Sequence, residues 1–359
     1  MPKNVLSIHY IRGISALLVV LFHFRGVIND VYAQNDLGHL LFRWGEIGVD
    51  VFFVISGFII CLSTKNTNRP GEFIAKRFFR IYPAYLFFII ISMLIGYYFS
   101  SINTADVINA IFILPADYSK GSPFFGYSYL IVAWSLFYEI CFYAIYVISM
   151  AISHRYRNLI CSLLILLMVF IPQVVVNGRI SASPLDYAGA SWLGYFNIFT
   201  SPMMLIFIVG ILIYECVPII KLVALRLDEW VIRVLFYSSA SFFIYCFMTG
   251  YNSWHGLTNS VVFIAPIIMC AILFEIRVGV KKSTFLSFLG DISYSLYLSH
   301  LIVLLLLSKF GGVFYHSSTG FSRLFILVSL SLITAYISFN LIEKPSAKLC
   351  RKLLTEKRP

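Results

Sequence analysis

The chain has 359 residues, of which 60% are hydrophobic and only 12% are charged, whereas an ordinary soluble domain carries roughly 25% charged residues. A water-soluble fold of this length does not need so much apolar surface, so lipid is the solvent that fits. The net charge of +11 does not indicate nucleic-acid binding, because the basic residues lie in short segments between apolar runs, as in the cytoplasmic loops of a membrane protein. The seven cysteines include no CxxC pair, so they are interpreted as small buried side chains and predict neither disulfides nor a metal site.

About ten segments are long and apolar enough to cross a bilayer, which takes about 20 residues in a helix. They predict an all-α integral membrane protein with spans near 7–27, 47–63, 79–99, 130–151, 158–176, 199–217, 230–250, 258–276, 288–308 and 321–342. Lys and Arg are concentrated in alternate loops, so the positive-inside rule predicts that both termini are cytoplasmic.

One transmembrane domain is expected to fill residues 1–345, followed by a short basic cytoplasmic tail over 346–359 and no soluble C-terminal domain. The longest loop, 100–129, is predicted to contain a short interfacial helix near 104–113 and to cover a site from the outer side.

The first span carries two ionisable residues, Arg12 and His23, and such residues are candidates for a functional site because they are expensive in lipid. Eleven residues make almost three helical turns, so both side chains face the same way, about 16 Å apart along the axis. The alternative is structural, with a histidine bonded to a neighbouring carbonyl and an arginine that snorkels. These interruptions also argue against a cleaved signal peptide.

The second span begins near Asp50, at about the depth expected for His23. A carboxylate there would orient the imidazole and raise its basicity; alternatively, Asp50 only complements the helix dipole in a first turn. Ser56 and Gly57 at mid-span allow either a close helix approach or a local break that lines a cavity.

Arg77 and Arg80 stand three residues apart at the start of the third span and share one helical face. Guanidinium pairs suit phosphate groups because they bind them bidentately. Positive-inside anchoring is the alternative, but it explains less well why both arginines run into an apolar span beside Tyr82 and Tyr85.

The fourth span carries a carboxylate, Glu139, well inside an otherwise apolar run. Ser135, Glu139 and Tyr143 follow each other at intervals of four residues and form one polar stripe, and a carboxylate in lipid must face a cavity, a partner or a substrate. Trp134 and Tyr138, with Tyr143, are candidates for a sugar-binding face, although aromatic packing explains each of them adequately.

In the ninth span, Ser293, Tyr297 and His300 form another polar face at i, i+4 and i+7. Hydrogen bonds between helices are the alternative to a substrate-facing role. The last span ends in Glu343-Lys344-Pro345, which is predicted to stop the helix.

Together these residues resemble acyltransferase family 3, the membrane acetylases of O-antigen, exopolysaccharide, peptidoglycan and similar acceptors. The resemblance covers almost the whole chain in the family's order and is carried by Arg12 with His23, Gly48-Val49-Asp50 through Ser56-Gly57-Phe58, Arg77 and Arg80 with Ile81-Tyr82-Pro83, Trp134-Ser135-Leu136 with Glu139, Ser293-Tyr294 through His300, and Glu343-Lys344-Pro345.

The resemblance implies a ten-helix protein of the bacterial inner membrane that uses cytoplasmic acyl-CoA, usually acetyl-CoA, as co-substrate, with no bound cofactor or metal. It implies that His23 is the central catalytic residue and that Arg77 and Arg80 hold the CoA phosphates. His23 then acts as a general base on a sugar hydroxyl, or takes the acyl group first as an acyl-imidazole, and the sequence leaves both routes open.

The remaining candidates are assigned by their place in the spans. We expect Glu139 and Asp50 to orient His23 or the acceptor hydroxyl, and Arg12 and Ser56 to contribute to donor binding. The residues expected to face the saccharide acceptor are Trp134, Ser135, Tyr138 and His300.

Two other function classes are weaker. A transporter or flippase for a lipid-linked saccharide predicts internal repeats, which the sequence does not show, and it leaves the arginine pair unexplained. A sensor or scaffold gains little from ionisable residues on several spans. The expected acceptor is a bacterial polysaccharide such as O-antigen on its lipid carrier, with a peptidoglycan sugar or a small metabolite as alternatives.

Overall fold

A computed structural model of the chain describes residues 5–99 and 103–356, without the side chains of 96–99. These residues are helical wherever they form regular structure, and no strand occurs among them. Nine segments of the described part are long and apolar enough to cross a membrane. The chain is therefore a multi-pass α-helical membrane protein, as its composition predicts.

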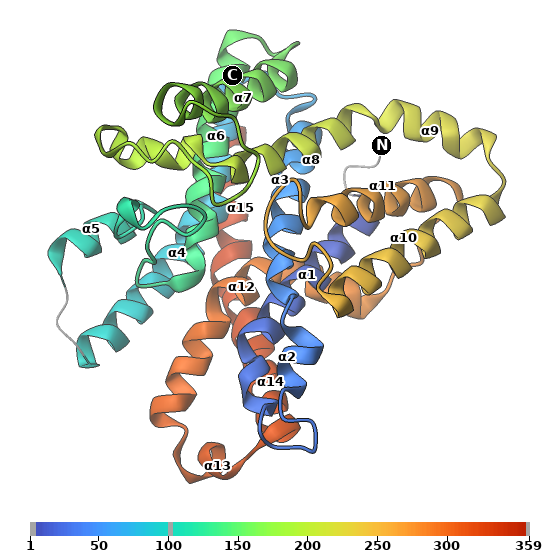
Figure 1. Cartoon of the computed structure of the whole chain (residues 1–359). Coiled ribbons are helices and arrows are strands. Elements are labelled where there is room, and N and C mark those ends of the chain that lie inside the picture. Colours follow the sequence, from blue (N-terminus) through green and yellow to red (C-terminus); the bar gives the residue numbers. More distant parts are fainter. Residues whose placement is uncertain (1–4, 100–102, 357–359) are drawn as a thin grey trace.

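The spanning segments are built on nine α-helices. These are α1 (Leu6–Phe24), α3 (Gly48–Thr64), α4 (Pro70–Phe99), α6 (Trp134–Ile152), α7 (Arg157–Asn177), α8 (Leu205–Glu215), α10 (Glu229–Thr249), α12 (Thr284–Phe310) and α14 (Gly320–Ser338). The two termini lie toward one end of the molecule, and α2 (Leu37–Phe42) and α13 (Gly312–Ser317) lie toward the other (Figure 1).

The predicted span near 258–276, which is not among these nine, corresponds to α11 (Val261–Arg277), a helix of 17 residues. That length is at the lower end of the range for a bilayer crossing. Two shorter helices lie in the connections, α5 (Thr104–Ile111) and α9 (Val217–Arg226). The position of α5 confirms the short helix predicted near 104–113.

Helices α1 and α12 pack against each other more extensively than any other pair. Glycine makes this approach possible, because a Cβ atom on Gly13 would lie only 2.6 Å from the backbone nitrogen of Gly290. The start of α1 is fixed by Glu275, whose carboxylate accepts hydrogen bonds from the backbone N–H groups of Leu6 (2.8 Å) and Ser7 (2.7 Å). This carboxylate satisfies donors that have no partner within the helix.

Helices α3 and α8 approach just as closely. A Cβ atom on Gly57 would overlap the carbonyl oxygen of Phe207, and one on Gly210 would overlap that of Val54. Helix α3 runs unbroken through Ser56 and Gly57. Of the two possibilities for this pair, the close helix approach is confirmed and the local break is wrong.

The predicted helix stop at Pro345 is also wrong. A single π-helical turn, Phe339–Glu343, joins α14 to α15 (Lys344–Glu356). Proline is tolerated in the first turn of α15 because its missing N–H disrupts little there. Helix α15 packs on α4, with the Ser346 hydroxyl donating to the carbonyl of Phe79 (2.7 Å) and Cys350 buried. The segment expected to be a tail is therefore part of the folded domain as far as Glu356.

Candidate active site

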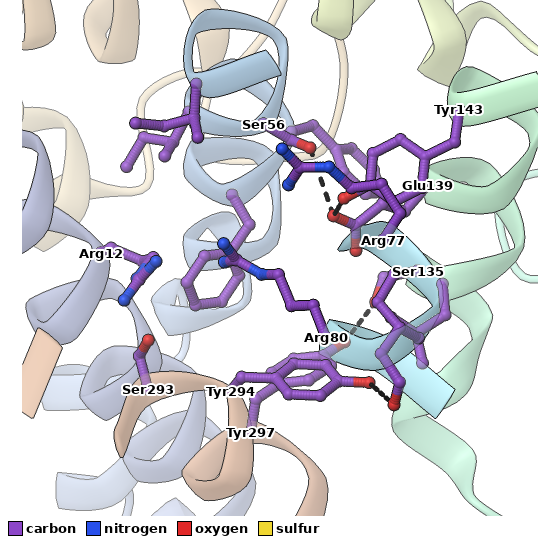
Figure 2. Close-up of a pocket in the computed structure, with 16 residues that line it drawn as sticks. Arg12, Ser56, Arg77, Arg80, Ser135, Glu139, Tyr143, Ser293, Tyr294 and Tyr297 are labelled. Carbon is purple, nitrogen blue, oxygen red and sulfur yellow. Dashed lines mark hydrogen bonds between the residues drawn. The ribbon is translucent and has the colours of Figure 1, made fainter. Parts of the chain in front are cut away.

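A narrow cavity of about 80 Å³ lies between α1, α3, α4, α6 and α12. The side chains of Arg12, Arg77 and Arg80 all line it, and Figure 2 shows their guanidinium groups directed toward a common space. We call this space the arginine cavity. Helix α4 begins at Pro70, well before the predicted start of its span, so Arg77 and Arg80 lie on a continuous helix, as their spacing predicts.

The arginines are only partly satisfied by the protein. Arg12 donates through Nη2 to the carbonyl of Gly290, and Arg77 donates through Nη2 to the hydroxyl of Ser63 (2.9 Å). The Nε atoms of Arg12 and Arg77 are buried and have no hydrogen-bond partner. Buried donors without partners are rare in native proteins, and a cation in a membrane domain calls for a counter-charge. These groups are therefore arranged to meet an anion.

One carboxylate faces the same cavity. Glu139 accepts hydrogen bonds from Ser56 (3.2 Å) and from Tyr143, and it forms no ion pair with an arginine among the described residues. Ser56 thus lies with the arginines, where it was expected to contribute to donor binding. Glu139, which was expected to orient His23 or the acceptor hydroxyl, lies there too, with Ser56 and Tyr143 as its partners. Three guanidinium groups against one carboxylate leave the cavity positively charged.

The far end of the arginine cavity is closed by a polar pair and an aromatic contact. The hydroxyls of Ser135 and Tyr297 lie 2.8 Å apart, and Tyr297 donates to the carbonyl of Val132 (2.8 Å). The ring of Phe52 packs edge-on against Tyr297, with 5.7 Å between centroids. Ser135, which was predicted to face the acceptor, therefore lines the arginine cavity with its hydroxyl engaged by Tyr297 of α12.

Behind Tyr297 lies a pair of histidines. Nε2 of His300 is 3.1 Å from Nδ1 of His23, and that same Nδ1 atom is 2.9 Å from the carbonyl of Val19. Nδ1 of His300 is 3.1 Å from the carbonyl of Leu296. A carbonyl can only accept, so for neutral imidazoles Nδ1 of His300 carries the proton and Nε2 of His300 is an acceptor. Nδ1 of His23 must then be the donor, which leaves a lone pair on Nε2 of His23.

The two polar residues of α1 contact the same neighbour. Arg12 reaches Gly290 and His23 reaches His300, both on α12, which confirms that they share one face of α1. His23 does not itself line the arginine cavity. The ring of His300 lies 6.2 Å from that of Tyr297, so Tyr297 contacts the histidine pair on one side and lines the arginine cavity on the other.

His300 was predicted to face the acceptor. It is instead fully buried, and both of its ring nitrogens are engaged within the protein. Its partner is His23, so it can influence the chemistry only through that imidazole.

Asp50 is not hydrogen-bonded to His23. Its carboxylate accepts from Nδ1 of His255 (2.8 Å), from the backbone N–H of Gly256 (3.0 Å) and from the hydroxyl of Ser260. Asp50 is 0% exposed and His255 is 1% exposed. Asp50 therefore anchors the loop between α10 and α11, because three donors of that loop converge on it.

His255 is a residue that the sequence did not single out. Burial lowers the pKa of His255, but the carboxylates of Asp50 and Glu46 raise it by more, so its pKa lies above the ordinary value. The one sequence signal was a histidine beside Trp254 in a loop between two spans, and nothing in its spacing pointed to Asp50.

Trp134 and Tyr138 hold the long loop after α5. The Trp134 ring packs edge-on against Phe124 (4.9 Å between centroids) and His255 (5.3 Å). Tyr138 is fully buried and its hydroxyl donates to the carbonyl of Pro123 (2.6 Å). Neither ring presents an open face in this structure, so aromatic packing accounts for both of them.

Within residues 5–99 and 103–356, no group of three or more His, Cys, Asp or Glu side chains is placed to hold a metal ion. The functional groups that the chain itself brings together here are three guanidinium groups, a carboxylate, two imidazoles and several hydroxyls.

Comparison with known proteins identifies relatives of the whole domain. The profile of a family described as "Acyltransferase domain" matches residues 5–340. The chain is 30% identical over 287 residues to the "Exopolysaccharide production protein ExoZ" of Rhizobium meliloti (strain 1021), which covers 78% of this chain and 83% of that protein. No solved structure matches the chain significantly.

Proposed function

Because this chain belongs to the acyltransferase domain family and is a multi-pass membrane protein, we propose that it transfers an acyl group from acyl-CoA to a hydroxyl of a cell-surface saccharide. Acetyl-CoA is the proposed donor and an exopolysaccharide the proposed acceptor. The name of the similar Rhizobium protein supports the acceptor class. The observation that carries the proposal is the arginine cavity.

The donor phosphates account for the unsatisfied arginines. Arg77 and Arg80 stand on one face of α4, and Arg12 faces them from α1. A diphosphate has the negative charge and the pairs of acceptor oxygens that planar guanidinium forks bind bidentately. Arg12 and His23 are eleven residues apart on α1, which corresponds to about 16 Å along the axis. An extended pantetheine arm anchored at the arginines spans a distance of this order toward the histidine.

His23 is the proposed catalytic residue because its Nε2 atom carries the free lone pair. In one route, Nε2 takes the proton of the acceptor hydroxyl as the oxygen attacks the thioester carbonyl; the C–S bond breaks, and the proton passes to the departing CoA thiolate. In the other route, Nε2 attacks the carbonyl first and the C–S bond breaks, which releases the CoA thiolate. The acceptor oxygen then attacks the acyl-imidazole, the N–C bond breaks, and the hydroxyl proton passes to the thiolate. Both routes use the same atom.

The thioester must pass Phe52 and Tyr297 to reach His23. Their rings close the far end of the cavity in this structure, so donor binding is proposed to move the Phe52 ring. Glu139 lies with the arginines on the donor side, where it would position the arm of the donor. The positive-inside distribution of Lys and Arg supports a cytoplasmic position for the arginine end of the bundle.

The test is acyl transfer by the purified protein. Nanodiscs containing the wild-type chain are supplied with radiolabelled acetyl-CoA and a saccharide-lipid extract, and the label in the saccharide fraction is compared with that from empty nanodiscs. Protein-dependent label in the saccharide is the expected result. CoA binding with label passed only to water would contradict the acceptor proposal.

A transporter of lipid-linked saccharide predicts a different result. A transporter would bind no CoA. Deletion of its gene would block polymer export and leave the acyl content of the remaining polymer unchanged. Absence of CoA binding by the wild-type protein would overturn the acyl-CoA proposal.

A further inference from the structure

A second cavity, of about 480 Å³, adjoins the arginine cavity on the side of α15. We call it the vestibule. Three arginines and Tyr294 line both spaces, so the two adjoin each other at these side chains. The outer wall of the vestibule is formed by α15, through Lys344, Ala347 and Arg351.

The wall is held in a fixed position by the packing of α15 on α4. Ser346 donates to the carbonyl of Phe79 on α4, and Cys350 is buried four residues later. Residues 344, 347 and 351 follow the i, i+3, i+7 spacing of a single helical face, which is the face that lines the vestibule. Lys344 and Arg351 are thus carried by a packed helix, about 10 Å apart along its axis.

The vestibule is strongly cationic. Its six basic side chains are Arg12, Lys76, Arg77, Arg80, Lys344 and Arg351. The two carboxylates there already have partners: Glu343 accepts from the backbone N–H of Ser295 (3.1 Å) and from its hydroxyl, and Asp291 lies 3.4 Å from Nε2 of His9. Among the described residues, neither Lys344 nor Arg351 forms an ion pair. Two separate groups of cations therefore face two adjoining cavities.

We infer that Lys344 and Arg351 of α15 bind the 3′-phosphate of the donor's adenosine, while the diphosphate lies deeper, against Arg77 and Arg80. This inference rests on the proposed acyl-CoA donor. CoA carries its phosphates in two places, the diphosphate and the 3′-position of the ribose, and the protein offers cations in two places along one path. Helix α15 would then distinguish acyl-CoA from donors that lack the 3′-phosphate.

The test is a comparison of two ligands that differ only in that group. Dissociation constants for CoA and 3′-dephospho-CoA are measured on the full chain in nanodiscs of neutral phosphatidylcholine. The wild-type protein is expected to bind CoA about tenfold more tightly, since a phosphate held by two cations forms charge-assisted hydrogen bonds. In Lys344→Ala/Arg351→Gln, CoA affinity should fall about tenfold, while affinity for 3′-dephospho-CoA should change less than twofold.

Lys348→Ala is the matched control, because Lys348 lies on the same helix but does not line the vestibule, and it should bind both ligands as the wild type does. The single variant Arg351→Lys keeps the charge and should retain most of the preference for CoA over 3′-dephospho-CoA. An equal loss for both ligands in the double variant, or no loss for either, would overturn the inference. A cationic wall that serves lipid phosphate instead would give equal affinity for the two ligands in the wild type, which also overturns it. A wild-type protein that binds neither ligand refutes the donor proposal itself, so the two failures are distinguishable.

Discussion

The histidine pair allows a quantitative prediction about a residue that acts through another. His300 contacts Nδ1 of His23 at 3.1 Å and does not line the arginine cavity. In His300→Gln, the hydrogen bond that helps to orient the His23 ring is weakened, while Nδ1 of His23 keeps the carbonyl of Val19 as a second acceptor at 2.9 Å. One net hydrogen bond is worth about 0.5–1.5 kcal/mol, and about 1.4 kcal/mol corresponds to a factor of ten in rate. We therefore expect kcat to fall about 2- to 10-fold, with KM for acetyl-CoA unchanged.

The assay is steady-state acetyl transfer in nanodiscs, normalised to the fraction of protein that binds CoA. Glutamine is used because it fills much of the imidazole volume, whereas alanine at this fully buried position would leave a cavity that costs about 2–5 kcal/mol of stability. A folded His300→Gln protein that is as inactive as His23→Ala would show that His300 itself moves the proton. An unchanged kcat would show that the pair only packs.

Three further predictions concern affinity and stability. Arg77→Lys keeps the charge but loses the planar fork, so CoA affinity measured by calorimetry should fall about tenfold; an unchanged affinity would remove Arg77 from the donor site. The pKa of His255 is raised in the folded protein, so the stability gained from its pairing with Asp50 is fully present below about pH 6.5 and is lost as the pH rises through the folded-state pKa. The difference in melting temperature between the wild type and His255→Gln should therefore shrink from pH 6 to pH 9. A difference that stays constant would contradict this. Gly57→Ala should lower the free energy of unfolding by about 1–3 kcal/mol because the added Cβ would overlap a backbone carbonyl of α8. The control Gly71→Ala, with no atom within 4 Å of the added Cβ, should melt at the same temperature as the wild type. Equal melting temperatures for the two variants would argue against the α3–α8 contact.

The sequence predicts the inward-facing residues well, for a physical reason. Charged side chains in lipid must face protein or a cavity, and helical periodicity says which of them share a face. This reasoning finds the common face of Arg12 and His23 and the pair of Arg77 and Arg80. It also finds Glu139, which turns out to face the arginines.

Contacts between distant segments are less accessible from sequence. Asp50 and His255 are 205 residues apart, and a loop histidine has no periodicity to link it to a carboxylate in a helix. The depth of Asp50 therefore suggested His23 as its partner, although depth along the membrane does not specify which side of a helix a side chain faces.

The C-terminal segment illustrates a second limit. Pro345 predicts a helix end, but a π-helical turn before it lets the chain continue to Glu356. Such a turn depends on tertiary packing and has no reliable sequence pattern. The basic residues after the last span therefore suggested a cytoplasmic tail, whereas Lys344 and Arg351 line a cavity.

The most direct test of acyl transfer through His23 is a single comparison. Wild type, His23→Ala and the control His316→Ala, at an exposed histidine outside the site, are incubated with radiolabelled acetyl-CoA and the saccharide-lipid extract, and label in the saccharide is counted. We expect the His23→Ala rate to fall by about 10²–10⁴ with CoA binding retained, and the control to match the wild type. A His23→Ala protein that binds CoA and transfers label at the wild-type rate would contradict the catalytic role of this imidazole.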